Sequence, residues 1–262
     1  MTALLDTARL TASLACLDNP ASLSKVTNRE LMANLFRGAE TAFLADDIKL
    51  ATPAYVRIDD GSGGTSAIWR KLLDAGLVAP IVLKPLQACG CSDAHNMAII
   101  LADTSSERWP RVTFPVFAQT FINHGGVVHK VSVLGDQVHV TQRESIPDIS
   151  TGDNAEVKSD SRPVAVLFDS QNMAGAALVH DGVLQSSSTR SRQGAFLNER
   201  YIKAAATHLR EQLDFNIFGF DVIVENGTGE HYVVDINYFP SLKDVPNARE
   251  NFWNVCHRIK TR

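Results

Sequence analysis

Two apolar runs near the C-terminal end, joined by a turn-forming stretch, constrain the fold of this chain most strongly. Residues 221–225 and 231–237 are rich in valine and isoleucine, and the residues between them include two glycines and an asparagine. This pattern is typical of a β-hairpin. With the turn centred on Thr228, Asp221 and Asp235 lie opposite each other on neighbouring strands. The chain is therefore expected to contain antiparallel sheet.

The same hairpin carries a candidate metal site. Asn237 lies two residues beyond Asp235 and projects from the same face of its strand. Two carboxylates and an amide oxygen on one surface suit Mg²⁺, which also binds phosphate oxygens. The alternative is an exposed polar face on an ordinary hairpin. Apolar neighbours such as Val222 and Ile236 favour a half-buried site, where facing carboxylates need a compensating cation.

Both strands and helices are predicted in the rest of the chain. Short apolar runs predict strands near 51–58, 79–85, 97–101, 116–122, 127–133 and 137–143. Helical periodicity predicts helices at 68–75, at 198–213 and at the C-terminus, and Thr27 with Glu30 forms a potential capping box. Residues 144–195 are polar and lack periodicity, so loops are expected there. The fold class is predicted as α+β with prominent antiparallel strands.

Composition excludes several classes of protein. A chain of 262 residues suffices for one medium domain or two small lobes. No apolar run is long enough to span a membrane, and the net charge of −4 argues against a nucleic-acid binder. Four cysteines are too few for a disulfide scaffold, so a reduced, cytoplasmic protein is expected. The sequence contains no Gly-x-Ser-x-Gly motif, so it gives no indication of a serine nucleophile.

Several basic residues occur within or directly after predicted strands. Lys84 ends an apolar strand before a loop of small residues, where its ammonium group can reach the phosphates of a nucleotide. Lys130 and Arg143 lie in later strands, and together with His95 and His124 they can line a pocket for a polyanion. Each residue also has a purely structural interpretation, such as a lysine at a strand edge or a histidine bonded within the core.

These motifs together resemble a known family. The segments that carry the resemblance are 82–97, 119–124, 142–145, 218–221 and 234–240, together with Lys130. In order and spacing they are similar to the inositol 1,3,4-trisphosphate 5/6-kinases, also called inositol-tetrakisphosphate 1-kinases, of the ATP-grasp fold. The resemblance implies two α+β lobes whose antiparallel sheets grip ATP between them. It divides the chain into a helical segment (1–50), a central lobe (51–118) and a C-terminal lobe carrying the metal hairpin (119–262).

The resemblance also implies a role for each motif residue. ATP would be bound by Arg29 and Lys84 at the phosphates, by the hinge strand from Gln119 to Ile122 at the adenine, and by Ser145. The inositol phosphate would be bound by His95, Lys130, Asn237 and Ser241. Lys130 and Arg143 would be catalytic, next to the transferred phosphoryl group. Mg²⁺, expected as two ions, would be held by Asp221, Asp235 and Asn237.

The chain departs from the family pattern at three places. Ser241 replaces a residue that is commonly glycine, and Cys89 replaces one that is often histidine or aspartate. Family members begin with an additional α/β domain that helps to grip the inositol phosphate, whereas this chain starts near the helix that follows it. We therefore expect the acceptor to bind more weakly, relative to ATP, than in the family.

The resemblance implies an enzyme that transfers the γ-phosphoryl group of ATP to a hydroxyl of an inositol tris- or tetrakisphosphate. Its expected partners are ATP and inositol polyphosphates, without nucleic acid or membrane, and the chain is expected to be a monomer. Two alternatives remain open. One is another ATP-grasp enzyme, a carboxylate–amine ligase. The other is a non-catalytic module that binds nucleotides or inositol phosphates.

Overall fold

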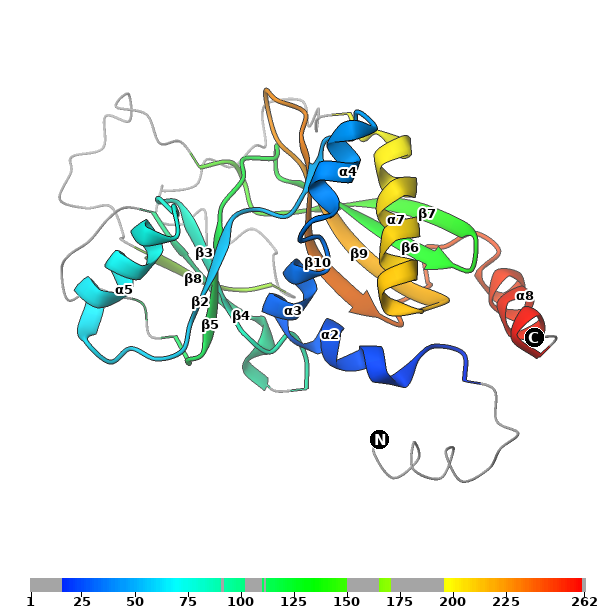
Figure 1. Ribbon diagram of the computed structural model, residues 1–262, viewed down its shortest axis with the longest axis horizontal. Coiled ribbons are helices and arrows are strands. Elements are labelled where there is room, and N and C mark those ends of the chain that lie inside the picture. Colours follow the sequence, from blue (N-terminus) through cyan, green and yellow to red (C-terminus); the bar gives the residue numbers. More distant parts are fainter. Residues whose placement is uncertain are drawn as a thin grey trace.

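Two five-stranded sheets organise the molecule (Figure 1). The computed structural model describes residues 16–90, 92–101, 110, 112–149, 165–170 and 196–260. The central sheet has the order β2 (Tyr55–Ile58), β5 (Val116–Thr120), β3 (Ile81–Pro85), β4 (Asn96–Ile100) and β8 (Ala165–Asp169). The C-terminal sheet has the order β1 (Leu50–Ala51), β10 (His231–Tyr238), β9 (Ile217–Val224), β6 (Val127–Leu134) and β7 (Gln137–Glu144). All neighbouring strands are antiparallel except β1 and β10.

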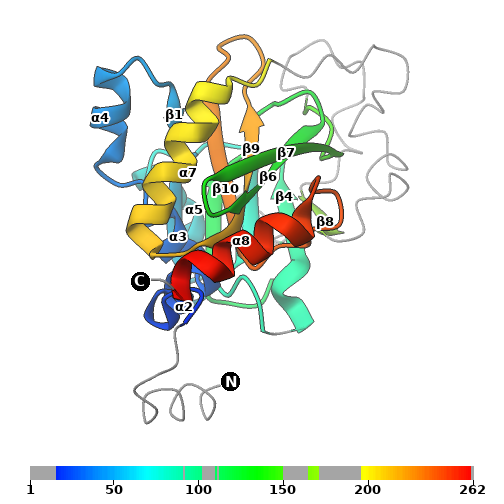
Figure 2. The same cartoon turned by 90° about the vertical axis from the view of Figure 1, so that its right-hand side faces the viewer.

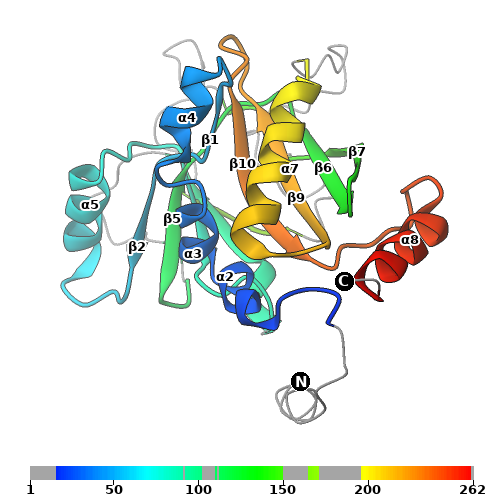
Figure 3. The same ribbon diagram turned by 45° about the vertical axis from the view of Figure 1, so that its right-hand side comes forward.

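Helices cover one face of each sheet (Figures 1 and 3). Short helices at the N-terminal side are η1 (Pro20–Ser22), α2 (Leu23–Thr27), α3 (Arg29–Asn34) and α4 (Ala39–Ala45). The remaining helices are α5 (Gly64–Asp74), η2 (Ser92–His95), α7 (Glu199–Leu213) and α8 (Ala248–Lys260). α5 packs on the central sheet through residues such as Leu72. α8 packs against the ends of β6 and β9 (Figure 2).

α7 covers the C-terminal sheet because its apolar residues recur at helical spacing. Ile202, Ala205 and Leu209 are buried against Val131 and Phe220 of the sheet. Successive strand residues point to opposite faces, so Lys130 and Asp221, the neighbours of these two sheet residues, project from the face opposite α7. The helix thus leaves one face of the sheet for polar side chains.

The structure differs from the sequence-based prediction in two local features near the N-terminus. The expected strand 51–58 is two strands, because β1 joins the C-terminal sheet and β2 joins the central sheet. The cap of α3 is Asn28 rather than Thr27. Asn28 Oδ1 accepts hydrogen bonds from the backbone N–H groups of Glu30 (3.0 Å) and Leu31 (3.2 Å), whereas Thr27 Oγ1 donates to the Ser24 carbonyl.

The segment expected to consist of loops contains a strand. β8 pairs with β4 and forms an edge of the central sheet; of the remainder of 144–195, the structure describes only residues 144–149 and 170. Residues 1–15 of the predicted helical segment 1–50 lie outside the described residues. Across the part of the chain that the structure describes, no helix has the length and apolar character required to cross a bilayer.

Candidate functional site

A cation and two carboxylates form a row across three adjacent strands of the C-terminal sheet. Lys130 on β6 is paired in register with Asp221 on β9, and Asp221 is paired with Asp235 on β10. Lys130 Nζ lies 2.8 Å from Asp221 Oδ2. The predicted opposition of Asp221 and Asp235 is confirmed, and Lys130 supplies the compensating cation that facing carboxylates require.

A β-bulge at Val234 produces this register. The pairs nearest the turn, from His231 with Val224 to Val233 with Val222, are centred between Gly227 and Thr228 rather than on Thr228. The register shifts after Val233, and this shift brings Asp235 opposite Asp221. A bulge places one extra residue in one strand and re-aims the neighbouring groups. The sequence therefore predicted the correct pair of carboxylates, although the strand pairs next to the turn are not centred on Thr228.

The two carboxylates are poorly solvated. Burial raises the pKa of Asp221 to about 6; Lys130 and Lys84 oppose this rise in pKa, and the nearby Asp235 adds to it. Asp235 Oδ1 is buried and has no hydrogen-bond partner. Such a pair of carboxylates, with the Asn237 amide two residues further along β10, provides hard oxygen donors for Mg²⁺. Within the described residues no group of three or more His, Cys, Asp or Glu side chains could hold a metal ion, so additional ligands would have to come from phosphate or water.

Lys84 connects the two sheets. Its ammonium group donates hydrogen bonds to Gln119 Oε1 on β5 (2.8 Å) and to the carbonyl oxygen of Val234 on β10 (3.2 Å). The bulge thus supplies the acceptor on the C-terminal sheet. Burial lowers the pKa of Lys84 to about 8, although the charge of Asp235 acts to raise it. The charged ammonium form therefore still predominates at neutral pH.

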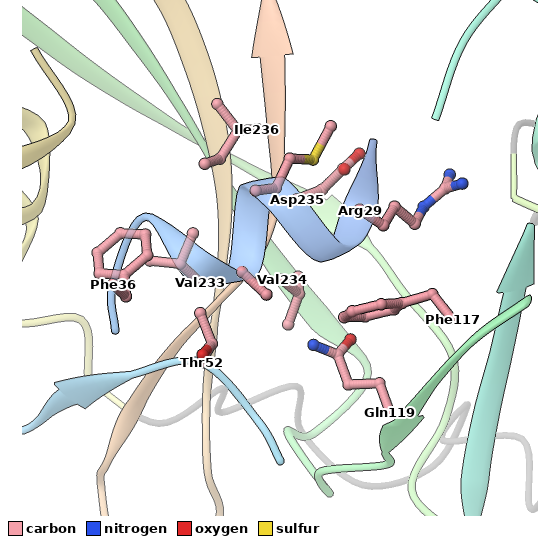
Figure 4. Close-up of a pocket in the computed structure, with 11 residues that line it drawn as sticks. Arg29, Phe36, Thr52, Phe117, Gln119, Val233, Val234, Asp235 and Ile236 are labelled. Carbon is pink, nitrogen blue, oxygen red and sulfur yellow. The ribbon is translucent and has the colours of Figure 1, made fainter. Parts of the chain in front are cut away.

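A small cavity of about 20 Å³ lies beside Lys84's partners (Figure 4). Residues of α3, β5 and β10 line it, including Arg29, Gln119 and Asp235. A volume of this size matches a single water molecule. Because residues of β5 and β10 both line this cavity, Asp235 lies where the two sheets meet. Asp221 and Asn237 line a second, larger pocket.

Arg29 is buried, with an exposed fraction of 4%. Its guanidinium group donates to the backbone carbonyls of Pro85 (2.5 Å), Gln87 (2.8 Å) and Ala94 (3.1 Å). These contacts fix the loop that follows Lys84. The contact between Arg29 and the ATP phosphates is implied by the resemblance and stays a prediction. The three hydrogen bonds given above bind the guanidinium group to the backbone of this loop.

The hinge predicted to receive adenine is ordered by a buried histidine. The backbone N–H of Phe121 donates to the carbonyl of Pro80 (3.1 Å). His124 Nδ1 lies 2.7 Å from the Ile122 carbonyl and Nε2 lies 2.8 Å from Ser145 Oγ. Burial lowers the pKa of His124, so the neutral ring donates from Nδ1 and accepts from Ser145. This bridge explains why Ile122 and Ser145 lie together.

A pocket of about 480 Å³ opens on the polar face of the C-terminal sheet. Four residues predicted from the sequence line it with Asp221: Lys130, Arg143, Asn237 and Ser241. Lys243 and Asp244 line it as well, and the sequence analysis missed them. Asp244 Oδ2 forms an ion pair with Arg143 Nη2. Because 101 residues separate the two partners, no local pattern could have indicated their contact.

Three other positions that were considered from the sequence lie outside this pocket: His95, His124 and Cys89. His95 is not among its lining residues; its Nδ1 lies 3.2 Å from Ser170 Oγ, at the edge of the central sheet. Cys89 is exposed and forms no disulfide bond with another described residue. The structure thus gathers Lys130, Arg143, Asn237 and Ser241 around Asp221 but leaves His95 apart.

Comparison with known proteins identifies relatives of this chain. A family model described as the inositol 1,3,4-trisphosphate 5/6-kinase ATP-grasp domain matches residues 44–257. The chain is 34% identical over 209 residues to inositol-tetrakisphosphate 1-kinase 6 of Oryza sativa subsp. indica, covering 79% of this chain but only 36% of that relative. It is 29% identical over 256 residues to inositol-tetrakisphosphate 1-kinase 1 of Zea mays, covering 92% of this chain and 68% of the relative.

Solved structures share the fold at low sequence identity. The ATP-grasp ligase PsnB, complexed with a phosphomimetic variant of its minimal precursor, Mg and ADP, has a TM-score of 0.55 and 15% identity over 100% of this chain and 70% of its own. D-alanine–D-alanine ligase from Bacillus anthracis has a TM-score of 0.51 and 14% identity over 94% of this chain and 70% of its own. The predicted α+β, ATP-grasp fold is therefore confirmed.

Proposed function

The chain belongs to the inositol 1,3,4-trisphosphate 5/6-kinase family, and on that premise we propose that it is a Mg²⁺-dependent kinase. It transfers the γ-phosphoryl group of ATP to a hydroxyl of an inositol tris- or tetrakisphosphate. The chain spans 36% of the length of the first curated relatives that it matches, so the activity is proposed from its own residues as well as from the family.

One observation carries this proposal: Lys130 and Asp221, two members of the row that ends at Asp235, line a pocket together with further cations. Phosphoryl transfer needs little covalent chemistry from the protein and depends on positioning and charge neutralisation. A site for this reaction therefore needs oxygen donors for a metal next to cations for phosphates. Asp221 and Asn237 provide the former at the pocket, and Lys130 and Arg143 provide the latter.

Asp221, Asp235 and Asn237 would hold magnesium, and we propose two ions. The buried, unpartnered Asp235 Oδ1 and the raised pKa of Asp221 support a cation at this place. When bound, Mg²⁺ would neutralise the charge of the transferred phosphoryl group. The three side chains fix where that charge can be accommodated, because they extend from two paired strands.

The nucleotide would lie between the sheets. Lys84 forms hydrogen bonds with both sheets, to Gln119 on β5 and to Val234 on β10, and its ammonium group thus lies near the carboxylates of the hairpin. Arg29 positions the loop after Lys84 through backbone carbonyls, and Ile122 with Ser145 forms the adenine side. Each of these assignments rests on family resemblance together with the contacts described above.

The acceptor would occupy the larger pocket, beside Asn237 and Ser241. Lys130 has a side chain that is 46% exposed, so its ammonium group can turn from Asp221 to an incoming phosphate at little cost. Arg143 adds positive charge on the neighbouring strand. The implied contact of His95 with the acceptor stays a prediction, since the residue does not line this pocket.

A release assay for ADP tests the proposal. Mg-ATP is incubated with the full chain alone and then with individual inositol tris- and tetrakisphosphates, and products are separated by chromatography. We expect ADP only when an inositol phosphate is present, together with a product carrying one more phosphate. ADP that appears only with a carboxylate and an amine would identify a ligase. Nucleotide binding without any ADP would identify a binding module.

The assembly and location of the chain remain predictions. We propose a monomer in the cytoplasm; the low cysteine content supports a reducing compartment. Size-exclusion chromatography with light scattering tests the first part, and a mass of twice 28.6 kDa would contradict it.

A further inference from the structure

An ion pair occupies one wall of the larger pocket. Arg143 lies on β7 and Asp244 lies in the loop between β10 and α8, and both line the pocket. Arg143 Nη2 donates to Asp244 Oδ2, and the two side chains are 52% and 45% exposed. Exposed ion pairs contribute little to stability, so this pair is better explained by what it presents to a molecule in the pocket.

Packing holds Asp244 at the rim of the pocket. On either side of it in the loop, Leu242 and Val245 pack against the buried cluster of Leu134, Ile217 and Val255, and the Val245 N–H donates to the Leu242 carbonyl (3.1 Å). The loop backbone that carries Asp244 cannot move away without exposing these apolar side chains, and the ion pair with Arg143 holds the carboxylate beside the guanidinium group. A molecule that approaches Arg143 therefore also meets Asp244.

The pair offers a donor and an acceptor side by side. A guanidinium group only donates hydrogen bonds, and a carboxylate only accepts them. A hydroxyl group can accept from Arg143 and donate to Asp244 at the same time. A phosphate group, with its oxygens ionised, only accepts and carries negative charge, so it gains from Arg143 but is repelled by Asp244.

Within the described residues, the other cations at the pocket form no ion pair with Asp244. Lys243 is exposed and lines the pocket, and no ion pair is recorded for it among the described residues. Lys130 is paired with Asp221, a proposed metal ligand whose charge a bound cation would offset. Phosphates of the acceptor thus find favourable positions near Lys243 and Lys130, whereas the position between Arg143 and Asp244 suits a hydroxyl. The other N–H groups of Arg143 remain available to the transferred phosphoryl group.

We propose that Asp244 is a specificity-determining residue, which together with Arg143 forms a subsite for a free hydroxyl of the acceptor. The chain then prefers acceptors with fewer phosphates, because each additional phosphate raises the chance that one must lie against Asp244. This inference rests on the proposed function and adds to it the feature that limits the phosphorylation of the acceptor.

Asp244→Asn tests it, because this variant keeps the size of the side chain and removes its charge. Asp136→Asn is the matched control. Asp136 also pairs with arginines, Arg210 and Arg258, but does not line the pocket, so the two variants change the net charge equally. Asp244→Glu restores the charge and serves as the conservative rescue.

Two quantities are measured for the wild type and the three variants. Calorimetry gives the affinity for inositol tris-, tetrakis- and hexakisphosphate, and ADP release gives kcat/KM for the first two. For Asp244→Asn we expect the affinity for the hexakisphosphate, relative to the trisphosphate, to rise about tenfold, since a charge a few ångströms from a phosphate is removed. The kcat/KM ratio of tetrakis- to trisphosphate rises with it. Asp136→Asn and Asp244→Glu keep the wild-type ratios.

The outcomes separate this inference from the proposed function. Turnover by the wild type with unchanged ratios in Asp244→Asn would overturn the inference alone. Altered affinity ratios without turnover in any variant would support the role of Asp244 in binding and contradict the kinase. An equal change of the ratios in Asp136→Asn would show that net charge, rather than the subsite, is responsible, and would also overturn the inference.

Discussion

Lys130 and Arg143, the two cations predicted to act in catalysis, each lie beside a carboxylate. Lys130 is paired with Asp221 and Arg143 with Asp244. A phosphate that approaches either cation therefore meets a carboxylate beside it, rather than an isolated cation. Replacing either carboxylate changes ligand affinity through the cation with which it is paired. The direction in which a single substitution changes ligand affinity can therefore be predicted.

Asp235→Asn should reduce turnover at least ~100-fold. The substitution removes one of the two carboxylate charges proposed to hold magnesium, and metal stabilisation of a transferred group is worth several kcal/mol. Steady-state ADP release at a series of Mg²⁺ concentrations measures the effect, with Asp136→Asn as a control of equal charge. Turnover and magnesium dependence like those of the wild type would rule out Asp235 as a ligand.

Lys84→Met and Lys130→Met should separate the two substrates. Methionine keeps the aliphatic stem and removes the charge, so packing is largely preserved. Loss of a charge-assisted contact is worth roughly 1.5–3 kcal/mol, and Lys84→Met should therefore weaken nucleotide binding at least about tenfold. Lys130→Met should abolish turnover while it changes nucleotide affinity by less than about threefold. Titration with a fluorescent nucleotide measures both, and equal weakening would contradict the assignment.

The pKa of Asp221 predicts a pH dependence in magnesium-free buffer. A folded-state pKa of about 6 lies above the ordinary value of 3.8, so the folded protein binds this proton more tightly than the unfolded chain. Stability from this group is present below about pH 4 and falls as pH rises to about 6. The loss is up to about 3 kcal/mol, at about 1.4 kcal/mol for each factor of ten in proton affinity.

Asp221→Asn should remove this dependence. Urea unfolding at pH 4.5 and pH 7 with EDTA gives the free energy of unfolding for the wild type and the variant. We expect the variant to gain stability relative to the wild type between these two pH values. A difference between the two proteins that is the same at both would show that Asp221 has an ordinary pKa.

At the scale of elements, Gly219 on β9 determines how closely the loop after β10 approaches the sheet. A Cβ atom at this position would lie 2.9 Å from the Val131 carbonyl oxygen and 3.1 Å from Pro240 Cβ and Cγ. The carbonyl belongs to the backbone and cannot move aside cheaply. Pro240 lines the larger pocket, so a shift of this loop also changes the pocket.

Gly219→Ala should therefore lower the free energy of unfolding by about 1–3 kcal/mol, as overpacking does in other cores. It should raise the KM for the acceptor more than the KM for ATP, because the strain falls on the larger pocket. Urea unfolding and steady-state kinetics measure these effects. Unchanged stability together with an unchanged acceptor KM would show that the loop adapts freely.

The hairpin shows what the sequence can predict about an element. Its apolar runs and glycines identify both strands, and the period of two places Asp235 and Asn237 on one face. The bulge at Val234 could not be predicted, because it depends on contacts with other strands and with Lys84. Similarly, the sequence indicates a helix start near residue 28, but only the structure shows that Asn28 rather than Thr27 caps it.

Contacts between distant segments limit how much of the candidate site could be predicted from the sequence. Lys84 and Gln119 were predicted from separate motifs, and their mutual hydrogen bond (2.8 Å) joins neighbouring strands of one sheet. The contact of Lys84 with Val234 spans 150 residues, and that of Arg143 with Asp244 spans 101. No local pattern encodes such pairs. For the same reason the sequence grouped His95 with the pocket cations, from which the structure keeps it apart.

At the scale of the whole molecule, Lys84 links the two sheets at the place where the nucleotide is proposed to bind. It extends from the central sheet and donates to Val234 of the C-terminal sheet, next to the proposed metal ligands. The ATP-grasp ligases that share this fold at 14–15% identity show the architecture alone. The chemistry assigned to this chain rests on the residues of the hairpin and of the larger pocket.

The fate of the γ-phosphoryl group tests this assignment most directly. Phosphorus NMR of the full chain with Mg-ATP and an inositol trisphosphate follows ATP, ADP, inorganic phosphate and phosphomonoesters in one sample. We expect ADP and a new phosphomonoester on the inositol in equal amounts, without a matching rise of inorganic phosphate. ADP accompanied by an equal amount of inorganic phosphate and no new phosphomonoester would contradict it.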